Sequence, residues 1–445
     1  MPGREATEPP AALPTATTAP PTPVATLASP LLSQARTALE AELDRIGARA
    51  ARQRGFKAAP DPDRAFIDSD ELAGLLIEEL SEPDVVVDIA NEEALYKLLG
   101  LIGQDDDLPE HYFNLYSTGV IGLYDPDTGK LFVLSGVAEP GDLTDRDERV
   151  YVHEYIHFLQ DGLFDLSAME DAAAVNSDRT MAFLTLVEGD ARYSESLYAE
   201  APVGGPRPSA PLTEFRPPPS PAPPYVLRRA LNFPYSTGRP FIAALSREGG
   251  LTRVNAAYSD PPTTTEQVLH PEKYLSGELG RDLTLPDAAD VLGPGWEQQD
   301  RNTLGEFGIA VWLEALGGFR GPAARAAAGW DGDAHLLMAG PAGEHAVAGV
   351  LAWDTPADAE EFYLELSDVL DRSGAFVDLP CPDGPSGDCP RPAGGWAWDG
   401  PGGVLALTRS ASGRLAAFAV APDAGRAAAL ADQVMAAASA GYTSP

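Results

Sequence analysis

One stretch of this chain constrains its fold more than any other. Residues 148–166 read ERVYVHEYIHFLQDGLFDL, and almost every position from Val150 to Leu166 is apolar or aromatic. At 100° per residue, His153 and His157 fall on one face of a helix and Glu154 lies on its flank. A helix that is apolar nearly all round must be buried. Burying two imidazoles and a carboxylate in it costs several kcal/mol unless each group finds a partner.

A bound cation resolves this conflict. Two neutral imidazoles at positions i and i+4 can both bind one Zn²⁺ at about 2.0–2.1 Å, which leaves room for a third ligand and a water molecule. Glu154 can then take a proton from that water. The H-E-x-x-H pattern therefore predicts a zinc site at His153 and His157. The alternative is a buried His–Glu–His hydrogen-bond cluster without a metal.

A third ligand is predicted on the next long helix, which the apolar spacing places at about 170–198. Glu188 lies beside the apolar stripe of this helix, where a carboxylate is costly to bury without a cation. Gly189 follows it and is expected to allow a close approach to the histidine helix. The alternative for Glu188 is a surface ion pair with Arg192 at i+4.

These two segments resemble a known family. H-E-Y-I-H followed by LVEGDA is similar to the gluzincin arrangement of thermolysin-like metallopeptidases, and more closely to uncharacterised bacterial proteins with a hairpin, an H-E-x-x-H helix and an E-G-D-A helix. The resemblance covers roughly residues 33–320. It implies a zincin-like catalytic domain with His153, His157 and Glu188 as zinc ligands and Glu154 as the general base.

The chain departs from related patterns at two places. The metzincin pattern requires Gly and His where this chain has Gln160 and Leu163, so that class is excluded. Thermolysin-like enzymes place an aspartate where this chain has Arg192. The carboxylate that orients a ligand must then come from elsewhere, and Asp161 and Asp190 are the candidates. Both can equally be solvated charges on their helices.

Two further segments are assigned to substrate binding. VIGLYDPDTGKLFVLSG, residues 120–136, predicts a β-hairpin with a turn at Asp125–Gly129. Its KLFVLS run can serve as an edge strand that pairs with an extended peptide, or it can merely pack on the histidine helix. In TTTEQVLHPEKY, His270 and Tyr274 are of the types that donate hydrogen bonds to an oxyanion. His270 can also simply cap a turn.

The rest of the chain divides into three parts. Residues 1–30 are rich in Pro, Thr and Ala and are predicted to be disordered. Residues 31–320 form the zincin-like domain, with helices at 31–54 and 68–80, two short helices before the hairpin, and a flexible Pro-rich insertion at 200–224. Residues 321–445 repeat a strand, strand, helix pattern and predict a small α/β domain. The fold class is therefore α+β.

The amino-acid composition limits the classes of binding partner that are expected for this protein. A formal charge of -36 excludes nucleic acid and anionic membranes as expected partners. No apolar run is long enough to span a bilayer. The N-terminal sequence resembles the spacer that follows a cleaved signal or a lipid anchor, so an extracytoplasmic, secreted or lipid-anchored protein is expected.

Two cysteines and two isolated histidines are the remaining residues of interest in the sequence. Cys381 and Cys389 flank a turn-rich loop that can close a disulfide, and the alternative is two unpaired thiols in a cytosolic protein. His335 and His345 are isolated on predicted strands, which is typical of packing or surface histidines rather than ligands.

The sequence as a whole predicts a zinc-dependent hydrolase, most simply a metallopeptidase that acts on a peptide or protein substrate. Zinc would polarise the scissile carbonyl, Glu154 would deprotonate the water and later protonate the leaving amine, and His270 or Tyr274 would assist. Two alternatives stay open: a catalytically degenerate metal-binding interaction protein, and a zinc hydrolase of a non-peptide amide or ester.

Overall fold

The protein is described from a computed structural model that covers residues 30–57, 62–119, 122–134, 143–200, 222–380, 391–392 and 394–441. The expected disordered tail (except its last residue), most of the expected insertion at 200–224 and both cysteines lie outside these ranges. Within them, no helix combines the length and the apolar character that crossing a membrane requires.

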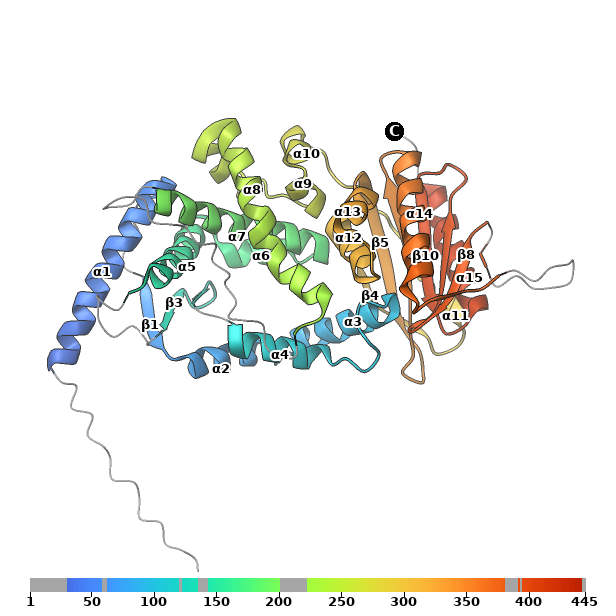
Figure 1. Ribbon diagram of the computed structural model, residues 1–445, viewed down its shortest axis with the longest axis horizontal. Coiled ribbons are helices and arrows are strands. Elements are labelled where there is room, and N and C mark those ends of the chain that lie inside the picture. The colour runs from blue at the N-terminus through green and yellow to red at the C-terminus, as the bar shows by residue number, and fades with distance from the viewer. Residues whose placement is uncertain are drawn as a thin grey trace, which may run out of the picture.

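The molecule is elongated, with a helical N-terminal half and a C-terminal half built on one large sheet (Figure 1). The first half has helices α1 (Pro30–Arg54), α2 (Ser69–Glu79), α3 (Pro83–Leu99), α4 (Leu108–Gly119), α5 (Asp145–Phe164), α6 (Leu166–Ala173), α7 (Ser177–Glu200), α8 (Tyr225–Ala256), α9 (Thr265–Leu269) and α10 (Pro271–Ser276), and strands β1 (Asp63–Ile67), β2 (Leu123–Asp125) and β3 (Lys130–Leu134). The second half has helices α11 (Ala289–Leu292), α12 (Gly305–Ala315), α13 (Arg320–Ala327), α14 (Pro356–Ser373) and α15 (Ala424–Gly441), and strands β4 (Glu297–Asn302), β5 (Trp330–Ala339), β6 (His345–Trp353), β7 (Val377–Asp378), β8 (Trp396–Gly400), β9 (Gly403–Arg409) and β10 (Leu415–Ala421). This mixture of helices and mainly antiparallel strands confirms the α+β class.

The small sheet beside the histidine helix has the strand order β1-β3-β2. The expected hairpin is present, since β2 and β3 pair in antiparallel fashion across the predicted turn. Strand β1, which the sequence did not predict, pairs with β3 in parallel. The expectation that KLFVLS is an edge strand is therefore wrong, because β3 is central and both of its edges are already paired.

Helix starts follow the capping chemistry of the sequence. Asp68 and Glu71 form the predicted capping box at the start of α2, and Thr144 with Asp147 forms one at the start of α5. The single helix expected at 170–198 is two helices, α6 and α7. The break has a local cause: the Asn176 side chain accepts a hydrogen bond from the Arg179 backbone N–H and begins a new helix there.

The large sheet has the order β4-β5-β6-β10-β9-β8-β7, and all its neighbouring strands are antiparallel. The expected small α/β domain is thus an antiparallel sheet with helices on its faces. Strand β4 belongs to it, so the boundary expected at residue 320 is too late. The predicted helix after Thr355 is confirmed as α14, with Thr355 as its N-cap.

Both faces of this sheet are buried, which explains why β10 is apolar at every position rather than alternating. One face carries bulky side chains such as Trp353, Trp398 and Phe418 and packs against α12, α13 and α14. The other face is rich in alanine and packs against α15. Small side chains on that face allow α15 to lie close to the strands.

Helix α7 packs against both α5 and α8 at the centre of the N-terminal half (Figure 1). Gly189 of α7 meets Gly238 of α8 so closely that a Cβ at Gly189 would lie 2.4 Å from the Gly238 carbonyl carbon. The sequence placed this close approach against the histidine helix, and that expectation is wrong. The glycine pair instead brings α8, and Tyr235 with it, to the site described next.

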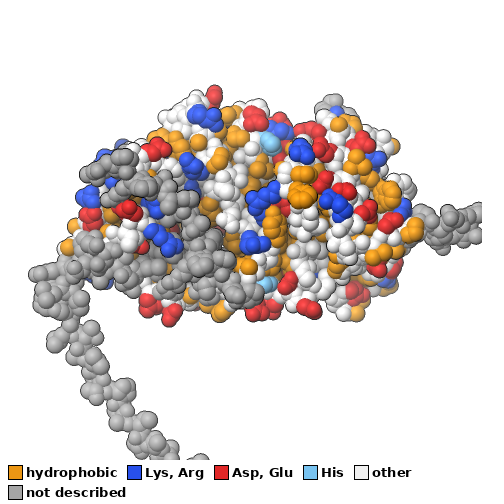
Figure 2. Space-filling view, viewed as in Figure 1, with side chains coloured by type: hydrophobic (Ala, Val, Ile, Leu, Met, Phe, Trp, Pro, Cys, Tyr) orange, Lys and Arg blue, Asp and Glu red, His pale blue; other side chains and the backbone are white. Residues whose placement is uncertain are grey.

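Charged side chains of both signs are interspersed on the face shown in Figure 2. The formal charge of -36 is therefore not gathered in one acidic area of that face.

Candidate metal centre

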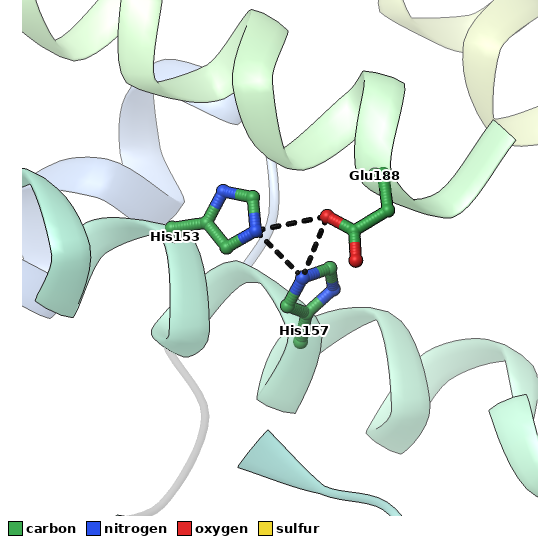
Figure 3. Close-up of side chains that lie close together, drawn as sticks. All are labelled: His153, His157 and Glu188. Atoms are coloured by element: carbon green, nitrogen blue, oxygen red, sulfur yellow. Dashed lines mark hydrogen bonds and ion pairs between the residues drawn. The ribbon is translucent and has the colours of Figure 1, made fainter. Parts of the chain in front are cut away.

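Three predicted side chains meet between α5 and α7 (Figure 3). The His153 Nε2 atom lies 3.0 Å from the His157 Nε2 atom and 3.0 Å from the Glu188 Oε2 atom. The His157 Nε2 atom lies 3.5 Å from the same carboxylate oxygen. Both imidazoles are buried, and the Glu188 side chain is 19% exposed.

This spacing fits a zinc ion. Ligand atoms at about 2.0–2.1 Å from a tetrahedral Zn²⁺ are about 3.3–3.4 Å apart, and the three separations of 3.0, 3.0 and 3.5 Å bracket that value. Two neutral nitrogens and one carboxylate oxygen also form the donor set of known catalytic zinc sites, which keep a fourth position for water. The chain therefore supplies three ligands of suitable type and spacing for zinc.

At each of the three groups, burial and the neighbouring charges shift the pKa in opposite directions, and the neighbouring charges decide the result. Burial alone would lower the pKa of His153, but its hydrogen bonds with Glu188 and Glu195 raise that pKa well above its ordinary value. Burial would also lower the pKa of His157, and the Glu188 charge raises it. Burial would raise the pKa of Glu188, but the His157 charge and the bond with His153 hold it far below its usual range. The buried carboxylate thus draws positive charge to this point, and protons compete there with a metal ion.

The second nitrogen of each imidazole has its own partner. The His153 Nδ1 atom lies 2.7 Å from the Glu195 Oε1 atom, and the His157 Nδ1 atom lies 2.8 Å from the Gln160 Oε1 atom. Neither of the expected orienting carboxylates, Asp161 and Asp190, bonds directly to an imidazole. Both imidazoles are therefore held at both ring nitrogens.

Asp161 and Asp190 serve other contacts. Asp161 accepts hydrogen bonds from the Tyr124 hydroxyl at 2.7 Å and the Leu166 N–H at 3.0 Å. Asp190 forms a fully buried ion pair with Arg54, at 2.6 Å between Asp190 Oδ1 and Arg54 Nε. Asp161 orders the end of α5, and Asp190 ties α7 to α1.

Glu154 lies beside the cluster but makes no bond to its ligand atoms. Its Oε2 atom accepts a hydrogen bond of 2.9 Å from the Tyr124 backbone N–H on the outer edge of β2. A Cβ at Gly122 would lie 3.1 Å from the Glu154 Cγ atom, so glycine allows this strand to lie against the glutamate. Burial raises the pKa of Glu154, while the two nearby imidazoles and the Tyr124 N–H partly lower it. A buried carboxylate with a raised pKa can act as a proton acceptor and then a donor.

A tyrosine that the sequence did not single out completes the cluster. The Tyr235 hydroxyl on α8 donates a hydrogen bond of 3.1 Å to the Glu188 Oε1 atom, and its ring centroid is 6.1 Å from that of His153. No local pattern marks Tyr235, because its position depends on how α8 crosses α7.

The two expected oxyanion donors are engaged elsewhere. The His270 Nε2 atom lies 2.9 Å from the Glu306 Oε1 atom, and the Tyr274 hydroxyl donates to the Asp260 carbonyl at 2.7 Å. In the described part of the chain, neither group bonds to His153, His157 or Glu188. The assignment of His270 and Tyr274 to the site therefore lacks geometric support.

The alternative role of Glu188 was a surface ion pair with Arg192, and Arg192 does not form that ion pair. Its Nη1 atom instead donates to both oxygens of Glu195, at 3.2 and 3.1 Å. Glu188 is thereby left to the imidazoles and Tyr235.

A second acidic group, formed by Glu266, Glu278 and Asp354, also has ligand atoms close together. The Lys273 ammonium lies 2.6–2.8 Å from all three carboxylates. Because a lysine already neutralises this group, it is an ion-pair cluster and is not assigned as a metal site.

Comparisons with known proteins bear on the other half of the chain. Residues 291–400 match the family described as Domain of unknown function (DUF8575). No curated protein and no solved structure matches the chain. The matched segment runs from α11 through β8, within the C-terminal half, and does not include His153, His157 or Glu188. The candidate metal centre therefore rests on its own geometry.

Proposed function

We propose that this protein is a zinc-dependent hydrolase that cleaves peptide bonds. The observation that carries the proposal is the convergence of His153, His157 and Glu188 from two helices onto one point, with separations that fit zinc. The resemblance of H-E-Y-I-H and LVEGDA to thermolysin-like metallopeptidases favours a peptide or protein as the substrate. The spacer-like N-terminal sequence favours an exported protein.

Zn²⁺ held by these ligands would supply a Lewis acid for the scissile carbonyl and lower the pKa of a water molecule to about 7. Glu154 accepts a proton from that water and returns it to the leaving amine. The Tyr124 N–H holds one Glu154 oxygen, which fixes the carboxylate beside the two imidazoles and leaves its other oxygen for the proton transfer.

Tyr235 replaces His270 and Tyr274 as the proposed oxyanion donor. Its hydroxyl lies at the cluster and is held there by Glu188, so a small rotation can turn it toward a developing negative charge. Removal of one such donor from a hydrolase typically lowers kcat by about 10²–10³-fold.

The test combines metal content with turnover. Purified protein should contain one zinc per chain by elemental mass spectrometry, and it should cleave members of a mixed peptide library in a manner that a chelator abolishes. Glu154→Gln should keep zinc and lower turnover by about 10²–10⁴-fold. His345→Ala, a histidine change in the sheet far from the cluster in sequence, is the matched control and should keep both zinc and turnover.

The same experiment separates the two alternatives. A protein that binds zinc but cleaves neither peptides nor model esters and amides would be a metal-binding interaction protein. Cleavage of esters or non-peptide amides alone would indicate the second alternative. Absence of zinc after saturation with the metal would refute the proposal itself.

A further inference from the structure

We propose that Gln160 and Glu195 are positioning residues that aim the two imidazoles at the metal, and that Gln160 does so only because Asp190 and Arg54 fix its amide. The inference rests on the proposed zinc site for the ion, but it concerns residues that no sequence pattern assigned to it. Two different devices, one amide and one carboxylate, hold two histidines on the same helix.

The amide orientation of Gln160 follows from its neighbours. Its Nε2 group donates to the Val187 carbonyl at 3.1 Å and to the Tyr258 hydroxyl at 2.7 Å, and it lies 3.3 Å from the Asp190 carboxylate. In the flipped orientation, the amide oxygen would face the carbonyl and the carboxylate, which are both acceptors. The amide oxygen must therefore face His157.

This orientation decides which nitrogen of His157 carries hydrogen. The Gln160 oxygen can only accept, so the His157 Nδ1 atom must donate. The Nε2 lone pair of the neutral ring is then free and points at the cluster. The partner of one ring nitrogen thus sets the role of the other.

Asp190 and Arg54 hold this arrangement in place. Asp190 accepts from Tyr258 at 2.9 Å and from Arg54 at 2.6 and 2.9 Å, and both ion-pair side chains are fully buried. Because Arg54 donates to both oxygens of Asp190, that side chain is held beside Gln160 and presents acceptor atoms to its amide. The chain of contacts therefore runs from Arg54 through Asp190 and Gln160 to His157.

His153 is held in another way. Glu195 lies seven residues after Glu188, or two turns of α7, so the two glutamates share one face of that helix. Glu188 contacts the Nε2 atom of His153 and Glu195 contacts its Nδ1 atom. Arg192, at the position where thermolysin-like enzymes carry an aspartate, holds Glu195 in place. The carboxylate that thermolysin-like enzymes carry at the position of Arg192 is thus replaced by Glu195, one helical turn later.

The test uses the full chain loaded with zinc and labelled with ¹⁵N-histidine. Gln160→Leu and Glu195→Leu should each weaken zinc binding by about 10–100-fold, measured by competition with a chromogenic chelator near neutral pH. Asp161→Asn, which changes the neighbouring side chain on α5, should leave the affinity within about twofold of the parent.

Hydrogen exchange at the imidazole N–H groups provides a readout that a merely structural role would not change. Gln160→Leu should speed exchange at His157 alone, and Glu195→Leu should speed it at His153 alone. The unaffected ring in each variant is an internal control for folding. Equal acceleration at both rings in both variants would overturn the inference.

The variant Gln160→Glu separates two explanations: that Gln160 is only an acceptor for His157, or that its amide is oriented by its other neighbours. It remains informative if Gln160→Leu does not fold. If Gln160 were only an acceptor for His157, a glutamate would bind zinc at least as tightly, since a carboxylate is the stronger acceptor. The structure instead places the new carboxylate beside Val187 O and Asp190, so zinc binding should weaken. Tighter binding would overturn the inference alone, whereas a parent protein that binds no zinc would overturn the proposed function.

Discussion

Replacement of Arg54 by methionine is expected to destabilise the metal-free protein by about 3–5 kcal/mol. Arg54 and Asp190 are both fully buried and form a two-point contact, with Arg54 Nε and Nη2 at 2.6 and 2.9 Å from the carboxylate. Methionine keeps most of the apolar stem but leaves the Asp190 carboxylate with only neutral donors, Tyr258 and Gln160. A buried charge that loses its partner is strongly destabilising.

The double variant Arg54→Met/Asp190→Leu isolates the cause. It removes both charges together, so the free energy of unfolding should recover most of the loss seen in Arg54→Met. Urea denaturation followed by circular dichroism measures all four proteins of the cycle. The double variant should nevertheless bind zinc more weakly than the parent, since Gln160 has lost the carboxylate that fixes its amide.

Two results would contradict this reasoning. An Arg54→Met protein within about 1 kcal/mol of the parent would show that the Arg54 guanidinium does not stabilise the buried Asp190 carboxylate. A double variant whose destabilisation equals the sum of the two single variants would show that the ion pair is not the coupled unit that the contacts indicate.

Three other expectations follow from the structure. Glu188→Ala should lower zinc affinity by orders of magnitude and remove the thermal stabilisation that zinc gives, as measured by chelator competition and by melting with and without the metal; parent-like affinity would refute its role. Gly238→Ala would place a Cβ 2.4 Å from the Thr185 carbonyl oxygen, so it should destabilise by about 1–3 kcal/mol or more and impair zinc binding, whereas Gly74→Ala in α2, with nothing within 4 Å, should be neutral or stabilising. Burial lowers the pKa of His335 to about 4, below its unfolded value of about 6.5, so its contribution to stability is present above pH 6.5 and is lost as the pH falls toward 4. His335→Leu should flatten this part of the stability profile, and an unchanged acid limb in urea titrations would count against the assignment.

Much of the candidate site was readable from the sequence because its pattern is local. The i, i+4 spacing of His153 and His157 depends only on helix geometry, and the apolar surroundings required that helix to be buried. Glu188 stood out as a carboxylate beside an apolar stripe. The seven-residue spacing from Glu188 to Glu195 was also available as a signal, since it places both on one helix face.

Other parts depended on contacts between segments far apart in the chain. Tyr235 reaches Glu188 because two glycines, Gly189 and Gly238, let α7 and α8 touch. Neither glycine could identify its partner from sequence alone. His270 and Tyr274 are of suitable residue types for oxyanion donors, but residue type alone does not show where a side chain lies. In the structure they bond to Glu306 and to the Asp260 carbonyl.

The fold, like the site, has some features that the sequence predicts and others that only tertiary packing decides. Hairpin, capping boxes and the apolar strands of the large sheet were predictable, because turn residues, caps and side-chain periodicity act within a few residues. Strand order was not: β3 became central only when β1 paired with it, and β4 joined the large sheet from before the expected boundary. Such pairings are made by backbone N–H and C=O groups that every residue except proline carries, so the tertiary packing decided them. The sequence by itself determined which helices must be buried and which ionisable groups they carry, whereas only the packed structure decided which of those groups meet.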